Sequence, residues 1–285
     1  MEKGLKVGRN HTLSLILFFI FQFGCESKEE WINTLPKPWT LSENDFSEIV
    51  PKFHKKFPKF HDRLKAFSNW QIGTPYKIFC LGEEVQPDPD PIFRLDVSDC
   101  TVHILTGLAS VQSKSWNEAK ENLIQIHYKT NNEGKSIPSY KRRWHFTTDR
   151  IQDNLSTQDI TSSFLPDNQL KKQKIILNQK ENGDEFLDLG WIKKTTVRYI
   201  PNDKITTDLL KKLPAIAGVA FVKESYFKMG LMIAHEGMII DQKDIIHASQ
   251  EFNQTVRMDF MDYYFKENAP RFDGVMIFSF HPLES

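Results

Sequence analysis

The chain has 285 residues, of which 37 are Lys or Arg and 37 are Asp or Glu. This length suits one large domain or two small ones, and a hydrophobic share of 40% is ordinary for a soluble globular protein. The balanced charge, and the lack of a basic stripe interleaved with aromatic residues, argue against a nucleic-acid partner.

The N-terminus has the pattern of a secretory signal peptide. Lys3, Lys6 and Arg9 precede an apolar run that extends from Leu13 to Phe23. A run of roughly 10 residues is too short for an ordinary membrane span of about 20, but it fits the apolar region of a signal peptide. We therefore expect residues 1–24 to be removed on export.

The run ends at Gly24-Cys25, and a polar stretch follows directly. A small residue before Cys at this place resembles the lipobox of bacterial lipoproteins, although Gln22 and Phe23 depart from the usual pattern. The resemblance implies that Cys25 is acylated and holds the protein at a membrane of the cell envelope, on its periplasmic or surface face. The alternative is an ordinary signal peptide with a chance Cys.

Beyond Cys25 the sequence predicts a tether over residues 25–42, with a Pro-bearing stretch at Leu35–Trp39, and a folded domain over residues 43–285. Ser42 with Asp45 marks a helix start. Apolar spacing predicts helical segments up to a break near Pro58 and on to Phe67, and further helices at 98–109, 115–128 and 260–265.

The C-terminal part instead contains short apolar runs typical of strands. They lie at 195–200, 216–222, 229–233, 238–240 and 275–280. Helices followed by strands indicate an α+β fold, in which residues 131–140 form a loop and about 112–190 form an insertion.

Cys100 stands out chemically because Ser98 or Asp99 can cap a helix that begins beside it. The positive end of a helix favours the reactive thiolate. Two other interpretations remain open: Cys100 packs in the core, or it forms a disulfide with Cys80 in an exported protein.

A series of short motifs on both sides of Cys100 allows a comparison with known protein families. They are, in chain order, Gly73–Tyr76, Ser98–Thr101, Arg143–Phe146, Asp159–Thr161, Arg198–Pro201, Lys228–Leu231 and Ile246–Ser249. From Phe67 to Tyr264 the chain resembles an N-acetylmuramoyl-L-alanine-amidase-like bacterial family within the NlpC-type papain-like cysteine peptidases. The resemblance implies a Cys-bearing central helix, an antiparallel sheet or half-barrel, and amide hydrolysis in peptidoglycan.

The resemblance also assigns roles to individual residues. Cys100 matches the nucleophile, and His247 matches a second His that orients the catalytic base. Tyr76, Asp99 and His145 are expected to contact the substrate. The base itself belongs to a His-x-Gly pattern, where this alignment places Lys228 before Met229-Gly230.

Lys228 makes the expected catalysis uncertain, because a protonated lysine accepts no proton. Three alternatives follow: the domain has lost its hydrolytic activity, it uses a Cys–Lys pair, or another His serves as the base. His103 would point sideways from the same helix, His235 is expected in a hairpin turn, and His145 lies in the insertion. His247 is the best of these substitutes.

The sequence thus predicts a cell-envelope cysteine amidase that acts on peptidoglycan or muropeptides through Cys100. Its rivals are a binding module that retains the cleft, and a structural protein with bridged Cys80 and Cys100. No metal-ligand spacing, phosphate loop or Gly-x-Ser-x-Gly turn is present in the sequence, so no cofactor or metal is expected.

Overall fold

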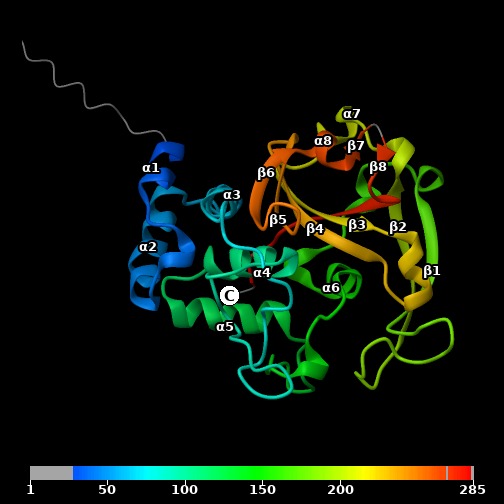
Figure 1. Ribbon diagram of the computed structural model, residues 1–285, viewed down its shortest axis with the longest axis horizontal. Helices are drawn as coiled ribbons and strands as arrows, with labels where there is room; N and C mark the ends of the chain where they lie inside the picture. The colour runs from blue at the N-terminus through cyan, green and yellow to red at the C-terminus, as the bar shows by residue number, and fades with distance from the viewer. Residues whose placement is uncertain (1–27, 268, 284–285) are drawn as a thin grey trace, which may run out of the picture.

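The computed structural model describes residues 28–267 and 269–283 (Figure 1). Cys25 and the predicted signal peptide lie outside these residues. Within the described ranges, the helices are all too short or too polar to cross a bilayer.

Helices dominate the N-terminal half of the described chain. They are α1 (Lys28–Thr34), α2 (Glu43–Lys56), α3 (Phe60–Trp70), α4 (Cys100–Ser110) and α5 (Trp116–His127). Ser42 caps α2 in a capping box with Asp45, as the sequence indicates. The expected break near Pro58 separates α2 from α3.

The segment predicted as a tether packs on the domain from α1 onward. Ile32 is buried, and the Trp31 ring lies 5.0 Å from that of Phe53. The Trp70 indole N–H donates to the carbonyl of Pro36 at 2.9 Å. Residues 28–42 are thus joined to the body, because Ile32 is part of the core and Trp31, Leu35 and Leu41 pack against it.

The C-terminal half forms an antiparallel sheet in the order β1-β2-β9-β3-β4-β5-β6. Its strands are β1 (Lys171–Leu177), β2 (Lys193–Pro201), β3 (Ile216–Val222), β4 (Ile233–Ile240), β5 (Asp244–Ser249), β6 (Gln254–Asp259) and β9 (Gly274–Phe278). Shorter elements complete the fold: α6 (Thr147–Asp153), α7 (Thr207–Leu210), α8 (Phe260–Tyr264), β7 (Phe265–Lys266) and β8 (Ala269–Pro270). The α+β class is confirmed.

One predicted strand, at 229–233, is wrong. The 3-10 helix η7 (Glu224–Met229) ends there in a turn, and β4 begins only at Ile233. Gly230 has a left-handed φ of 72°, and a Cβ on it would lie 2.5 Å from the backbone nitrogen of Gln179. The close approach of another backbone segment therefore requires a glycine turn where the apolar pattern favours a strand.

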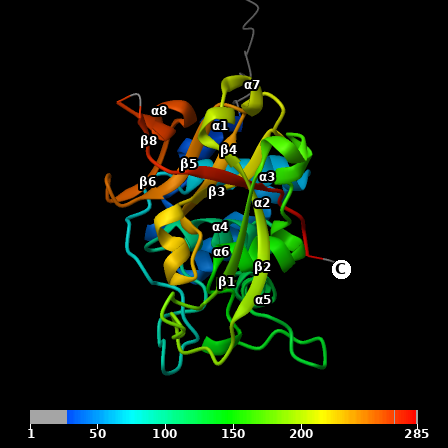
Figure 2. The ribbon, with the colours of Figure 1, turned by 90° about the vertical axis from the view of Figure 1, so that its right-hand side faces the viewer.

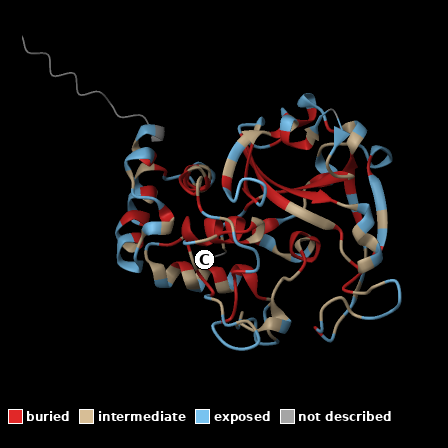
Figure 3. Ribbon diagram, viewed as in Figure 1, coloured by how far each residue is buried: buried red, intermediate tan, exposed pale blue. Residues whose placement is uncertain are grey.

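Helix α4 lies at the centre of the molecule. It packs against α3 and α5 on one side and against β4 and β5 on the other (Figures 1 and 2). Figure 3 shows that buried residues concentrate on α4 and on the strands that face it. This packing places the N-terminal end of α4 against the sheet, where β4 and β5 carry histidines.

Candidate active site

Cys100 is the first residue of α4, and Asp99 caps the helix. One carboxylate oxygen of Asp99 accepts the N–H of Val102 at 2.8 Å. The other accepts the N–H of Phe79 at 3.1 Å, which ties the preceding loop to the helix. Cys80 and Cys100 are both free thiols, so the bridged, structural interpretation is wrong.

A pair of histidines occupies the neighbouring strands β4 and β5. His235 Nε2 and His247 Nδ1 lie 2.8 Å apart, at hydrogen-bond distance. The two rings meet edge to face at a centroid distance of 4.9 Å. His235 was expected in a hairpin turn but lies within β4, whose partner strands β3 and β5 hold it in place.

Gly237 allows this close approach of the two strands. A Cβ at Gly237 would lie 3.0 Å from the Cβ of His247 and 2.9 Å from a methyl carbon of Ile245. This glycine ends a His-x-Gly sequence, His235-Glu236-Gly237. Only a residue without a side chain fits there, because strand β5 packs closely against it. This spacing was the signal that could have identified His235.

These residues share one cleft of about 1090 Å³. Five of the predicted site residues line it, namely Tyr76, Asp99, Cys100, His145 and His247. His235 also lines it, in hydrogen-bond contact with His247. The cleft thus brings together a thiol, a hydrogen-bonded imidazole pair and a tyrosine.

Lys228 does not belong to this group. It lies in η7, before the start of β4, and is not among the described residues that line the cleft. The structure therefore places Lys228 apart from the other predicted site residues. The histidine of the His-x-Gly pattern is seven positions further along, where β4 carries it to His247.

A buried carboxylate connects the helix of the thiol with the strand of the histidine. Glu236 and Arg150 form an ion pair, and both side chains are 0% exposed. Thr101, next to Cys100, donates its hydroxyl to Glu236 at 2.7 Å. Thr147 adds a second hydroxyl at 3.3 Å. Because Glu236 follows His235 directly, this network fixes the spacing between α4 and β4.

The electrostatics favour neutral forms of the reactive groups. Burial, together with the negative charges of Asp99 and Glu236, raises the pKa of the Cys100 thiol. Burial and the neighbouring charge of His247 hold the pKa of His235 well below its usual value. Burial likewise lowers the pKa of His247 to about 4. These shifts favour an uncharged thiol and uncharged imidazoles in the cleft.

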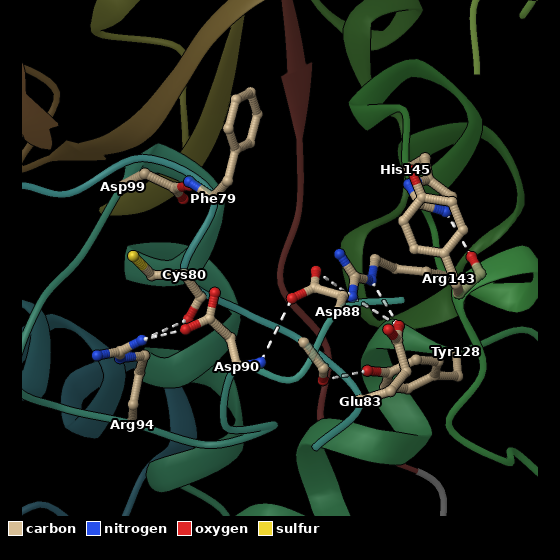
Figure 4. Close-up of polar contacts among 12 residues, drawn as sticks. Phe79, Cys80, Glu83, Asp88, Asp90, Arg94, Asp99, Tyr128, Arg143 and His145 are labelled. Atoms are coloured by element: carbon tan, nitrogen blue, oxygen red, sulfur yellow. Dashed lines mark hydrogen bonds and ion pairs between the residues drawn. The ribbon is translucent and has the colours of Figure 1, made fainter. Parts of the chain in front are cut away.

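A second set of ion pairs, drawn in Figure 4, holds the part of the cleft wall that carries Asp88 and Arg143. Arg143 donates to Glu83 at 2.6 and 2.9 Å and to Asp88 at 2.9 Å. In Figure 4 the ring of Phe79 points away from this cluster, beside Asp99. Phe79 is 79% exposed and lines the cleft. Arg143 is thus neutralised by protein carboxylates.

Within the described ranges, no group of three or more His, Cys, Asp or Glu side chains is arranged to hold a metal ion. His145, which lines the cleft, contacts the carbonyl oxygen of Tyr140 through Nε2. Burial lowers its pKa to about 4. His145 therefore contributes a neutral polar group to the wall.

Several solved structures share this fold. A Legionella pneumophila protein of the family DUF1460 is 22% identical, with a TM-score of 0.67 over 86% of this chain and 97% of that one. An N-acetylmuramoyl-L-alanine amidase from Bacteroides uniformis is 21% identical, with a TM-score of 0.57 over 76% and 98%. A putative xylanase from Bacteroides fragilis is 23% identical, with a TM-score of 0.57 over 75% and 98%.

No curated protein matches the chain. The family model described as AmiA-like, N-acetylmuramoyl-L-alanine amidase-like, matches residues 66–270. That match includes Cys100, His235 and His247 and covers more than half of the sequence. The chain belongs to the AmiA-like, N-acetylmuramoyl-L-alanine amidase-like family.

Proposed function

We propose that this protein is a cysteine amidase that hydrolyses an amide bond of peptidoglycan, on a papain-like domain of the NlpC type. The observation that carries the proposal is the hydrogen-bonded pair of His235 and His247 in the same cleft as Cys100. Family membership supports the amide substrate. The cysteine mechanism rests on the side chains themselves.

In this mechanism the Cys100 sulfur attacks the carbonyl carbon of the amide, and His235 takes the thiol proton. The carbon–nitrogen bond breaks as His235 returns that proton to the leaving amine, which leaves a thioester on Cys100. Water then attacks the thioester with His235 again as base, releasing the carboxylic acid and restoring the thiol. The N-terminal end of α4 stabilises the negative charge on the carbonyl oxygen.

His247 acts as the positioning residue for His235. Its Nδ1 faces His235 Nε2 at 2.8 Å, which leaves the Nδ1 side of His235 for the thiol. The side chain of His247 is 2% exposed, and its ring packs on Tyr263 at 4.4 Å. A buried orienting group of this kind restricts the rotation of the catalytic imidazole.

The same proposal includes export and a lipid anchor at Cys25. A lipoprotein held at a membrane of the cell envelope meets peptidoglycan directly. Gly24-Cys25 after the apolar run supports this part of the proposal.

The test uses purified peptidoglycan fragments and follows the release of free amino groups. Wild-type protein should hydrolyse the fragments, and Cys100→Ala should reduce the rate to background. If wild-type protein binds the fragments but does not hydrolyse them, the result favours a binding module over an enzyme. Hydrolysis that survives Cys100→Ala would refute the cysteine mechanism.

A further inference from the structure

The segment that ends α2 and leads into α3 is strongly basic. Residues 49–61 contain four lysines and two histidines, and neither Asp nor Glu. Lys52, Lys55 and Lys56 lie on α2 at spacings of three and four, so they share one side of the helix, and Lys59 directly precedes α3. Lys52, Lys55 and Lys59 are exposed. We call these four lysines the basic patch.

The exposed lysines of the patch are not neutralised by the part of the chain that the structure describes. No ion pair of Lys52, Lys55 or Lys59 is found there. Cations in the last turn of a helix are stabilised by the macrodipole, which accounts for Lys55 and Lys56. Lys52 precedes that turn and Lys59 lies beyond the helix, so the dipole does not account for the whole patch.

The patch lies beside α1, where the chain arrives from the proposed anchor. The ammonium of Lys56 is 5.4 Å from the centre of the Trp31 ring, and this ring is 6.0 Å from that of Phe57. Helix α1 begins at Lys28, three positions after Cys25. Three residues reach at most about 11 Å. Acyl chains on Cys25 would therefore hold this end of the molecule next to the bilayer.

The surface around the patch suits lipid headgroups better than a nucleic acid. Phe53 and Phe57, which alternate with the lysines in the sequence, are buried, so they offer no ring on which a base could stack. Anionic headgroups require only a positively charged surface close to the bilayer. In Figure 1, α1 and α2 lie at one end of the long axis of the molecule, and β1 and β2 lie at the other.

We propose that the basic patch contacts anionic phospholipid headgroups and orients the domain on the bilayer. The inference rests on the lipid-anchor part of the proposed function and adds a second contact beside the acyl chains. A lysine near an anionic surface strengthens membrane partition about fivefold, over a Debye length of about 8–10 Å. The patch alone binds weakly, so the acyl chains remain the anchor. The contact turns the β1–β2 end away from the membrane.

The test measures vesicle partition of residues 25–285 with Cys25→Ser, so that no acyl chain contributes. The vesicles contain phosphatidylcholine alone or an equal mixture with phosphatidylglycerol. The protein should bind the mixture and stay free of phosphatidylcholine, and about 1 M salt should release it, because the Debye length falls to about 3 Å. Replacing three lysines together, Lys52→Gln, Lys55→Gln and Lys59→Gln, should weaken binding about 100-fold.

The matched control is a second triple variant, Lys174→Gln, Lys194→Gln and Lys212→Gln, which changes the net charge by the same amount. These lysines are exposed and lie on β1, on β2 and after α7. The control should lose less than about threefold, because its sites are far from the bilayer on the scale of the Debye length. Both triple variants should keep the melting temperature of their parent, since the replaced side chains are exposed.

Three results would overturn the proposal. One is equal binding of the parent protein to the two kinds of vesicle. Another is an equal loss in the two triple variants, which would show an effect of net charge alone. The third is a patch variant that keeps its vesicle binding but loses binding to isolated peptidoglycan, because the patch would then contact the cell wall.

Incorporation of labelled fatty acid separates this inference from the lipid-anchor proposal. If the full-length protein incorporates none, the anchor at Cys25 fails, while vesicle partition still tests the patch. If it incorporates fatty acid but the Cys25→Ser protein does not distinguish the two kinds of vesicle, the anchor stands and the patch is refuted. A preference for the anionic mixture that the patch variant loses would support the patch in either case.

Discussion

Replacing Glu236 with Gln should destabilise the protein strongly, because it leaves the buried Arg150 without its counter-charge. Both side chains are 0% exposed, and two guanidinium nitrogens of Arg150 donate to Glu236. Two unit charges about 4 Å apart interact by about 4 kcal/mol at an effective dielectric constant of about 20. Breaking a buried pair costs about 3–5 kcal/mol in measured cases, a similar range.

The assay is urea unfolding followed by tryptophan fluorescence. Glu236→Gln should lower the free energy of unfolding by about 3–5 kcal/mol. Thr101→Val, which removes the 2.7 Å hydrogen bond but keeps the ion pair, should cost about 1.5–3 kcal/mol. It should also lower kcat more than it changes KM, because Thr101 links the helix of Cys100 to Glu236.

The double variant Glu236→Met with Arg150→Met is the decisive control. Removing both charges leaves none unpaired, so it should be less destabilised than Glu236→Gln alone. A loss of stability below about 1 kcal/mol in Glu236→Gln would refute the reasoning. So would a double variant whose loss of stability equals the sum of the losses in Glu236→Met and Arg150→Met.

Three further predictions follow from the cleft and the N-terminus. Gly237→Ala should reduce kcat and cost about 1–3 kcal/mol of stability, because its Cβ would lie 3.0 Å from that of His247; unchanged kcat and melting temperature would contradict this. Acidification from pH 7 to pH 5 should lower the melting temperature. Burial lowers the pKa of His103 to about 3 in the folded protein. Below about pH 6.5 the unfolded chain therefore binds a proton at His103 that the folded protein does not bind, and this stabilises the unfolded state. The loss from His103 alone is about 2 kcal/mol at pH 5, and a His103→Leu variant should show a shallower decline, whereas the same slope in both proteins would exclude this origin. Cys25→Ser should release the protein from membranes and abolish incorporation of labelled fatty acid, and unchanged membrane partition would remove the lipoprotein interpretation.

Local signals in the sequence predicted much of the helical half. Ser42, Asp99 and Ser115 each accept a backbone N–H at the start of a helix, as their side chains and positions indicate. The strand at 216–222 was also predicted with its observed bounds. These features depend on neighbours within a few residues, which a single sequence displays directly.

The sequence did not indicate His235, the proposed base, for a different reason. Glu236-Gly237 after His235 indicated a hairpin turn, yet Glu236 is buried and pairs with Arg150, 86 positions earlier. No local pattern reveals a partner at that distance. Lys228 was chosen for its own glycine two positions later, but Gly230 forms a turn rather than a strand contact. The two candidates, Lys228-Met229-Gly230 and His235-Glu236-Gly237, are distinguished by the structure, which places the first in η7 and its turn and the second in β4.

The position of Arg271 in the cleft wall also could not be predicted from the sequence. Its position depends on the contacts of α8 and of the strand pair β7–β8, which place its guanidinium over the Tyr263 ring. The sequence pattern predicts a helix at 260–265 and gives no sign that Tyr263 lines the cleft. The residues that border a site from separate elements therefore require the tertiary structure.

The most direct test of the central claim compares His235→Ala with Lys228→Ala in one turnover assay on peptidoglycan fragments. Removing a general base costs about 100- to 10,000-fold, so His235→Ala should lose at least about 100-fold in kcat. Lys228→Ala, outside the cleft, should retain wild-type kcat. Loss of activity in Lys228→Ala, with His235→Ala unaffected, would contradict the assignment of His235 as the base.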